Sequence, residues 1–298
     1  MDCQRNSMCC CRLPPNRSSR THRSRFVRSR WNHRLVCGLV RGELQMRIVS
    51  LVPSLTLTLF ELGCTTEEIV GRTPWCIHPK DAVEQVQVVG GTKTPNVKKI
   101  MALNPELVVL DQEENPKKIH DEFVDAGINV FVSSVKHPAE VPEMLRQLGE
   151  AIDRKESAEK WASSIESKLR WMKKNPLQSV RVAPMIWHEP LMSVGPGKYA
   201  GGLLTTLGLE VPALVEGGNG YPVVTPEALI EHNVEWLLLS SEPHDFALEE
   251  GEAIAAEMRK LGGQGAHSTC IDGEALTWFG TTTLAGLETL HKTLSDVI

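Results

Sequence analysis

Nine residues, GRTPWCIHP (71–79), place a tryptophan, a thiol and an imidazole in one short segment with two prolines. Cys76 and His78 are residue types that bind borderline metals such as zinc, and a thiol beside an imidazole can also act as a nucleophile with its base. Trp75 suggests a third use, because an aromatic ring on a loop makes a large apolar contact at small entropic cost. The segment is therefore a metal site, a catalytic pair or one wall of a ligand pocket.

Direct metal binding would use cysteine and histidine side chains from distant parts of the chain. The set is Cys76, His78, His188 and His244, with Glu189 as a further oxygen ligand. Its spacings, Cys-x-His and His-Glu, do not match the CxxC or HExxH patterns of zinc sites. No intrinsic metal or other cofactor is therefore expected, and the alternative to a ligand pocket is a cytosolic protein that binds a metal ion directly through this set or acts as a sensor.

A catalytic pair is not favoured. Residues two apart rarely bring a thiol and an imidazole into hydrogen-bonding contact, and no third group that would orient His78 is evident. The sequence has no GxSxG, P-loop or dinucleotide-binding motif. We expect a binding protein rather than an enzyme, with Cys76 as a small buried residue.

The surrounding sequence predicts an α/β fold. The apolar run at residues 47–52 is typical of a buried strand, and the following proline opens a helix. "TPNVKKIMALNPELVVLDQEE" (94–114) has a threonine N-cap, a helix, an asparagine and a buried strand that ends in acids. "TPEALIEHNVEWLLLSSEP" (225–243) repeats that order about 130 residues later, which indicates two Rossmann-like lobes of one design.

Residues 138–175 connect these lobes. Apolar residues keep helical spacing on both sides of the charged stretch DRKES, and no glycine or proline lies between Gly149 and Asn175. A single helix from Pro142 to Lys174 would be about 50 Å long. We predict one long backbone helix, with two helices broken near Asp153 as the alternative. The expected domains are thus an N-terminal lobe at 46–137, the linking helix at 138–175 and a C-terminal lobe at 176–298.

The loops after the strands are the expected ligand site, because open α/β sheets bind ligands beyond the carboxyl ends of their strands. Three of the seven tryptophans fall in such loops. We predict a cleft between the lobes with aromatic walls and polar contacts. The candidate residues are Trp75, His78, Thr92, Lys93, Glu113, Trp187, His188, Glu189, Tyr221, Glu242, Trp278 and Phe279. The competing interpretation is that the aromatic residues only cap the core of each lobe.

Charge divides the chain into two unequal parts. Residues 1–45 hold ten arginines and two acids, giving +8, and the other 22 basic and 35 acidic residues give −13 for residues 46–298. The basic segment also holds five of the eight cysteines and reads as disordered. It is a basic tail, an organellar transit peptide or, as we favour, an extension upstream of a true start at Met46. The acidic body argues against a nucleic-acid partner.

Several motifs in their order resemble one family. They are "RIVSLVPSLTLTLFELG", "EIVGRTPWCIHP", "VVGGTKTPNVKKIMALNPELVVLDQEEN", "VTPEALIEHNVEWLLLSSEP" and "LTWFGTTT". Together they resemble the vitamin B12 and iron-siderophore class of ABC-transporter substrate-binding proteins over residues 46–298. The resemblance implies two α/β lobes bridged by a rigid helix, with a metal chelate such as cobalamin or a ferric siderophore held between them.

The resemblance also carries individual residues. Trp75 matches an aromatic position in the ligand loop of the B12-binding member, and Trp278 matches a tryptophan that faces the corrin. His78 falls at an aromatic position and Asp111 at a tryptophan, so the pocket implied here is more polar.

The expected partners are a small-molecule chelate and an ABC permease, for a protein that is monomeric. No run of 18 apolar residues exists, so no membrane-spanning helix is expected. Residues 1–45 show no clear secretory signal, which favours the cytoplasm, whereas the resemblance implies the periplasm or cell envelope.

Overall fold

The computed structural model describes residues 45–218 and 220–298. The expectations for the basic, cysteine-rich N-terminal segment, including its disorder, lie outside the described residues apart from Gln45. Within the described ranges, no helix is both long enough and apolar enough to cross a bilayer.

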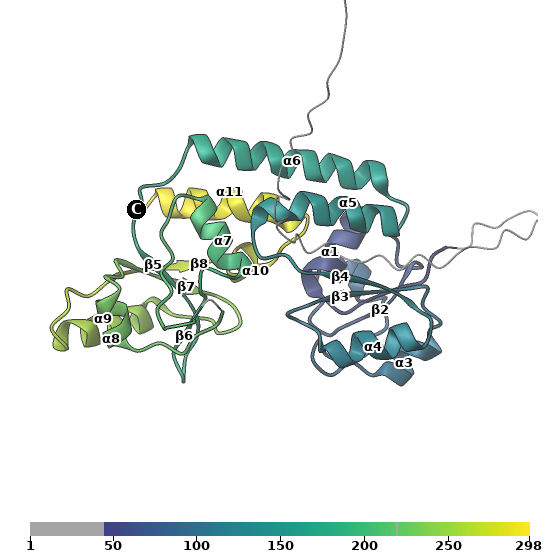
Figure 1. The fold of residues 1–298 in the computed structure, drawn as a ribbon, viewed down its shortest axis with the longest axis horizontal. Coiled ribbons are helices and arrows are strands. Elements are labelled where there is room, and N and C mark those ends of the chain that lie inside the picture. Colours follow the sequence, from purple (N-terminus) through teal and green to yellow (C-terminus); the bar gives the residue numbers. More distant parts are fainter. Residues whose placement is uncertain (1–44, 219) are drawn as a thin grey trace, which may run out of the picture. The chain divides into compact units, whose positions relative to one another are not determined.

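The first lobe is built on a four-stranded parallel sheet in the order β2-β1-β3-β4. Its strands are β1 (Ile48–Ser50), β2 (Ile69–Arg72), β3 (Leu107–Asp111) and β4 (Asn129–Ser133). All five residues of β3 are buried, as expected for a central strand covered on both faces. Helices α1 (Pro53–Glu61), α2 (Lys80–Val83), α3 (Val97–Ala102) and α4 (Lys117–Asp125) complete the lobe (Figure 1).

The second lobe repeats this plan with one difference. Its sheet has the order β6-β5-β7-β8, in which β5, β7 and β8 are parallel and the edge strand β6 is antiparallel to β5. The strands are β5 (Val182–Trp187), β6 (Met192–Ser193), β7 (Trp236–Ser240) and β8 (His267–Ile271). The helices are α7 (Tyr199–Thr206), α8 (Pro226–Glu231), α9 (Leu248–Lys260), α10 (Gly273–Thr277) and α11 (Thr282–Ser295). The prediction of two α/β lobes is therefore confirmed.

The caps of the two repeated helices differ from the prediction in one case. Thr225 caps α8 as expected, with its side chain accepting a hydrogen bond from the Ala228 amide. The cap of α3 is Asn96, whose Oδ1 lies 3.0 Å from the Lys99 amide nitrogen, and Thr94 lies outside the helix. The extra residues between Thr94 and the helix allow Asn96 to take over the capping role.

The connection between the lobes contains two helices rather than one. A short 3-10 turn, η1 (Pro138–Glu140), leads into α5 (Val141–Ala151), and α6 (Lys155–Lys174) follows after a break. Asp153 in that break has φ of 56°, a left-handed conformation that ends the first helix. The continuous helix predicted from Pro142 to Lys174 is wrong, and the alternative break near Asp153 is confirmed.

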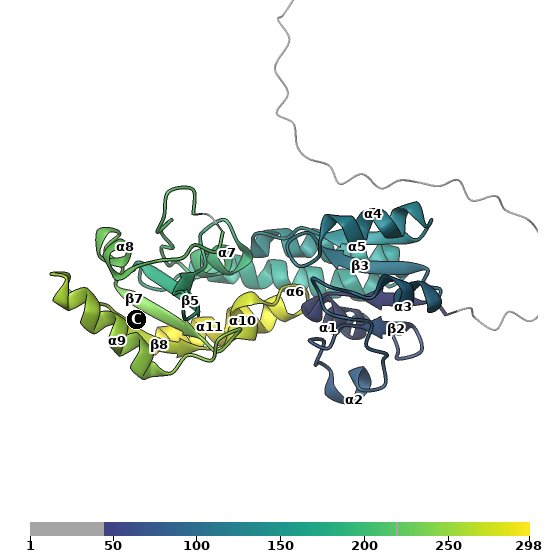
Figure 2. The same ribbon diagram turned by 90° about the horizontal axis from the view of Figure 1, so that it is seen from below.

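The two helices fold back on each other, and α6 alone is the long backbone helix (Figures 1 and 2). Gly149 permits this return, because a Cβ built there would lie 2.3 Å from the Ala158 Cβ. At 20 residues, α6 is about 30 Å long. It reaches both lobes, since Trp161 donates to the Glu61 carbonyl of the first and Lys168 pairs with Glu288 of the second.

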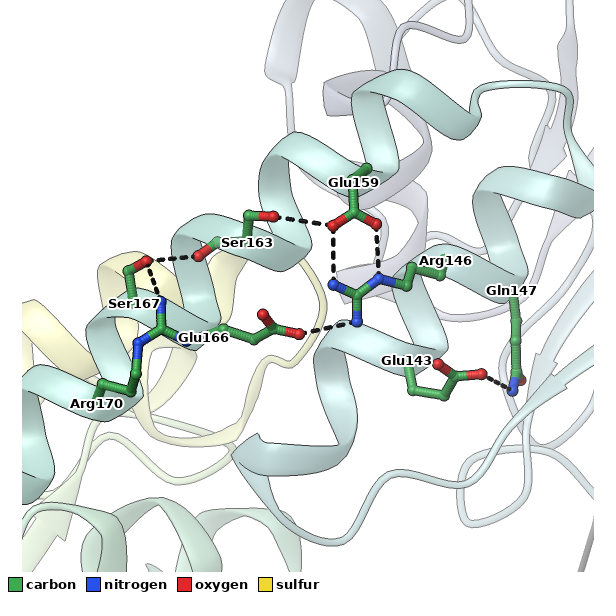
Figure 3. Close-up of polar contacts among 8 residues, drawn as sticks. All are labelled: Glu143, Arg146, Gln147, Glu159, Ser163, Glu166, Ser167 and Arg170. Carbon is green, nitrogen blue, oxygen red and sulfur yellow. Dashed lines mark hydrogen bonds and ion pairs between the residues drawn. The ribbon is translucent and has the colours of Figure 1, made fainter.

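An arginine fixes α5 against α6. Arg146 makes a two-pronged contact with Glu159, at 2.7 and 2.9 Å, and a third contact at 2.9 Å with Glu166, about two turns further along the same face of α6 (Figure 3). The planar guanidinium suits such a fork of carboxylates better than an ammonium would. These contacts set the register of the two helices on their solvent side.

The described residues belong to one compact unit, and each lobe has an apolar cluster of its own beside the largest cluster, which runs through both lobes. It joins α1, α5, α6, α7 and α11, and among its fully buried members are Leu55, Leu59, Leu145, Leu148, Leu203, Leu287 and Leu290. Thr58 of α1 also lies 3.2 Å from Thr281 at the start of α11. We therefore expect only small movements of one lobe against the other, because such movement would disturb a packed core.

Candidate functional site

Loops from both lobes meet at the carboxyl ends of the strands. In the first lobe these are the loops after β2 and β3, and in the second lobe they are the segments around α7, after β7 and after β8. Two groups of side chains join them. The Glu113 contact is defined as Glu113, Lys198 and Tyr221, and the His78 contact as His78, Glu274 and Trp278.

The Glu113 contact links the turn after β3 to the second lobe. Lys198 Nζ lies 2.7 Å from Glu113 Oε1, and the Tyr221 hydroxyl lies 3.3 Å from Oε2. The ammonium of Lys198 also lies 4.9 Å from the centre of the Tyr221 ring, a cation–π distance. Lys93 donates to the Glu113 carbonyl oxygen. The predicted residues Lys93, Glu113 and Tyr221 are thus brought together, around a lysine that the candidate set did not include.

Electrostatics in this contact keep Tyr221 protonated. Partial burial raises the pKa of its hydroxyl, and the neighbouring Glu113 and Glu114 carboxylates raise it further. Burial likewise raises the pKa of Glu114. Tyr221 can therefore donate a hydrogen bond to a carboxylate or to a ligand acceptor throughout the neutral range.

The His78 contact links the GRTPWCIHP segment to α10. His78 Nε2 lies 3.1 Å from Glu274 Oε1, and its ring meets the Trp278 ring edge-on at 5.6 Å between centroids. Glu242 lies beside this contact. Burial raises the pKa of Glu242, followed by repulsion from Glu274 and Asp272, while Trp278 and His78 act in the opposite direction. The loops of the two lobes therefore make a second contact with each other, and it uses Glu274, which sequence reasoning missed.

The aromatic candidates separate into two classes. Trp75, Trp187 and Tyr221 are 63%, 40% and 49% exposed, which is high for large aromatic side chains. Phe279 is buried and lies 5.7 Å from the Tyr199 ring, so it belongs to the shared core and does not line an open surface. The interpretation that an aromatic residue only caps the core therefore applies to Phe279. The next residue, Gly280, packs closely on Thr58.

Two further candidates, Thr92 and Glu189, and Asp111, which the resemblance singled out, are placed as follows. The Thr92 carbonyl accepts a hydrogen bond from the Asn115 side chain at 2.9 Å, which ties its loop to the turn after β3. Glu189 is exposed and has a left-handed backbone with φ of 60°. Asp111 is buried, and its carboxylate accepts from Ser133 and from two backbone amides, so it shapes the turn that carries Glu113.

The metal set proposed from the sequence does not assemble. Cys76 is fully buried, its Sγ is 3.0 Å from the Thr56 hydroxyl, and burial raises the pKa of its thiol, which disfavours the thiolate that a metal or a substrate would need. His78 contacts Glu274 instead. His188 and His244 do come together, with Glu250 as a third group that sequence reasoning missed.

Comparisons with known proteins bear on the family and the fold of the chain. Residues 48–260 match the model of the family described as Periplasmic binding protein. The Vitamin B12-binding protein of Pectobacterium carotovorum subsp. carotovorum (strain PC1) is 21% identical over 208 residues, covering 68% of this chain and 74% of its own length. The protein of that name from Vibrio campbellii is 24% identical over 198 residues, covering 65% and 70%.

Solved structures of the same fold are also similar. The periplasmic heme-binding protein RhuT from Roseiflexus sp. RS-1, in apo form, has a TM-score of 0.70 at 19% identity, covering 85% of this chain and 98% of that one. The periplasmic vitamin B12 binding protein BtuF of Vibrio cholerae has a TM-score of 0.69 at 17% identity, with the same coverage. At these identities the structural likeness supports the fold alone.

Proposed function

Because the chain belongs to the periplasmic binding protein family, we propose that it binds a metal-chelate ligand, first of all a corrinoid, between its two lobes. The observation that carries this proposal is the meeting of strand-end loops across the lobes. Glu113 contacts Lys198 and Tyr221, and His78 contacts Glu274 and Trp278.

The exposed aromatic residues beside these contacts favour a large, flat ligand. Trp75 lies in the loop after β2 and Trp187 is the last residue of β5 in the other lobe, and their exposed rings would be covered by a bound macrocycle. Burying one such ring stabilises a complex by roughly 2 kcal/mol or more. We propose Trp75, His78, Tyr221 and Trp278 as the principal ligand contacts, with Trp187 beside them.

The charges of the site favour a corrinoid over an anionic chelate. Lys198, the more buried of the two lysines here, is already paired with Glu113, and Glu242 and Glu274 add negative charge on the other side. A ferric catecholate or a heme with ionised propionates would meet this charge unfavourably. The side-chain amides of a corrinoid are neutral and can form hydrogen bonds with carboxylates, hydroxyls and imidazoles.

The family also guides the proposals for partner and location. We propose that the protein delivers its ligand to an ABC permease and acts outside the cytoplasm. The preference for the cytoplasm that the sequence suggested is not supported by the comparisons, because the matching family is one of periplasmic binding proteins. Binding without chemical change is the proposed activity.

A fluorescence titration of the full chain tests the corrinoid proposal. Cobalamin, cobinamide and hemin are added separately while tryptophan emission is followed. We expect saturable quenching with both corrinoids, and at least about fivefold weaker binding in Trp75→Ala and in Trp278→Ala. Trp171→Ala is the matched control, because Trp171 is 45% exposed but lies on α6, away from the strand-end loops.

Two results would contradict the proposal. One is the absence of saturable quenching with either corrinoid, and a response to hemin alone would then move the assignment to heme. The other is an unchanged corrinoid affinity in both loop tryptophan variants, which would place the ligand elsewhere. Thermal unfolding of each variant shows whether a loss of binding reflects a loss of folding.

A further inference from the structure

Two histidines and a glutamate converge on the second lobe, at the same edge of its sheet as the proposed ligand site. His188 directly follows β5, His244 lies in the loop after β7, and Glu250 lies in the first turn of α9. His188 Nδ1 is 2.6 Å from Glu250 Oε1, and His244 Nε2 is 2.9 Å from the same oxygen. All three donor atoms lie within 4.8 Å of one another.

We propose that His188, His244 and Glu250 form a binding site for a divalent transition-metal ion, with zinc as the best match to the donor set. Two imidazoles and one carboxylate are the protein ligands of many open zinc sites, which keep a fourth position for water or another ligand. This site is separate from the metal that a bound chelate would carry, and it does not depend on the proposed corrinoid function.

The three side chains are held in place by groups that a metal ion would leave undisturbed. Glu250 Oε2 lies 2.8 Å from the Ala247 amide nitrogen and caps α9, so Oε1 alone faces the histidines. The buried Phe246 lies under both rings, stacked on His188 at 6.2 Å and edge-on to His244 at 4.5 Å. This support outside the ligands is typical of metal sites, where it fixes ring orientation.

The observed geometry can be compared with a coordinated one, in which the two histidine nitrogens, now within 4.8 Å of each other, would need to approach by no more than about 1.5 Å. A tetrahedral zinc ion with bonds of about 2.0–2.2 Å separates neighbouring donor atoms by about 3.3 Å. The present nitrogen–oxygen distances of 2.6 and 2.9 Å therefore need to open by less than about 1 Å. The side chains of His188, His244 and Glu250 are 37%, 32% and 25% exposed, so an ion can reach them from solvent.

The local charge also favours a cation. Asp245 and Glu249 flank the two ligands from the β7–α9 segment, and no lysine or arginine pairs with Glu250 among the described residues. The negative surroundings extend to Cys270, whose pKa is raised first by burial and then by Asp245, Glu249 and Glu250. Cys270 itself is not among the three ligand groups.

The test is a titration of the full chain with Co²⁺, in the absence of any chelate ligand, followed by displacement with Zn²⁺. Visible absorption reports tetrahedral coordination, and the thiolate charge-transfer band separates this site from the cysteines of residues 1–45. We expect one Co²⁺ equivalent without thiolate character that Zn²⁺ displaces. Zinc should also raise the thermal unfolding midpoint, because the ion binds only the folded site.

Three variants locate the ion. His188→Ala, His244→Ala and Glu250→Gln should each weaken this equivalent by about tenfold or more, since even outer-shell changes cost 10–100-fold. Glu250→Gln retains an oxygen that can cap the Ala247 amide, so α9 should stay intact. The control is His120→Ala, which removes a half-buried histidine 2.9 Å from Asp121, a pair that belongs to no group of three such ligands among the residues that the structure describes.

The outcomes are distinct from those of the corrinoid test. Loss of the thiolate-free equivalent in the three variants but not in His120→Ala supports the site. The proposal is overturned if wild type binds no such equivalent, or if the three variants retain it unchanged. Neither overturning result bears on corrinoid quenching, because no chelate is present in the metal titration.

Discussion

The turns after β3 and after β7 occupy the same place in the two lobes, and they are built on the same frame. Each preceding helix ends near an asparagine in the left-handed conformation, Asn104 with φ of 47° and Asn233 with φ of 51°. Seven residues after each asparagine the strand ends, at Asp111 in one lobe and at Ser240 in the other. The repeated sequence order thus sets the backbone, and the residue at the strand end sets the chemistry of the turn.

The two strand-end residues make the same turn by different means. Asp111 accepts hydrogen bonds from the amides of Glu113 and Glu114 and from the Ser133 hydroxyl, at 2.8, 3.2 and 2.6 Å. Ser240 has a single oxygen, which donates to the Glu242 carbonyl at 2.7 Å and faces the Glu242 amide at 3.2 Å. The first turn therefore depends on one buried charge, whereas the second depends on a neutral hydroxyl.

Removing each strand-end side chain in turn should give the largest difference in stability between the two turns. Asp111→Ala leaves two amides and a hydroxyl without their acceptor in a buried place, and we expect the free energy of unfolding to fall by about 3 kcal/mol. Ser240→Ala removes one hydroxyl and should cost about 1 kcal/mol. Urea unfolding of both variants measures the difference, and equal losses would show that the two turns are equivalent.

The charge of Asp111 should also make the first turn sensitive to pH. Burial raises the pKa of Asp111 above its ordinary 3.8, with Glu113 adding to it and its three hydrogen bonds acting in the opposite direction. A carboxyl group with a raised pKa in the folded state binds its proton more tightly there. Its contribution to stability is therefore largest below the unfolded pKa and is lost as pH rises through the folded pKa.

Asp111→Asn measures this effect, since the amide keeps the shape and does not titrate. The free energy of unfolding of wild type minus that of Asp111→Asn should decrease as pH rises from about 3 to 7. The free energy of unfolding of wild type minus that of Ser240→Ala should not change with pH, because a hydroxyl does not ionise in this range. A flat difference for Asp111→Asn would mean that its hydrogen bonds offset the cost of burying the charge.

The repeated frame explains how much of the fold could be predicted. Two threonine–proline segments, each followed by an asparagine and an apolar strand, indicated the two lobes and placed Glu113 and Glu242 in strand-end loops. The single helix predicted across Asp153 was wrong, because the break depends on the tight packing of Gly149 against Ala158, a contact between helices that local sequence does not encode.

The site was predicted less completely, for a related reason. Trp75, His78, Tyr221 and Trp278 were proposed as ligand residues because aromatic and imidazole groups are conspicuous in strand-end loops, and their contact with a ligand stays a prediction. Charged groups on helices were missed. Glu250 and Glu274 lie in the first turns of α9 and α10, where an acid is ordinarily explained by the helix dipole alone. Only the folded chain shows that these two carboxylates face histidines from other elements.

The smallest expected difference concerns the two glutamates nine residues after the paired asparagines. Glu113 is joined to Lys198 across the lobes, with side chains 28% and 21% exposed, so Glu113→Gln should lower the free energy of unfolding by about 0.5–1 kcal/mol. Glu242 faces the carboxylates Glu274 and Asp272, so Glu242→Gln should leave stability unchanged or raise it slightly. The opposite signs follow from the partner of each carboxylate and not from its place in the frame.

A double-mutant cycle with Lys198→Met isolates the pair across the lobes. The cost of Glu113→Gln should fall to near zero when Lys198 is absent, whereas the effect of Glu242→Gln should be the same in either background. If Glu113→Gln costs as much without Lys198, its stabilising role lies in the Tyr221 hydroxyl contact. The two lobes would then be joined there by a neutral donor, and the turn after β3 would resemble its counterpart after β7 more closely than the ion pair suggests.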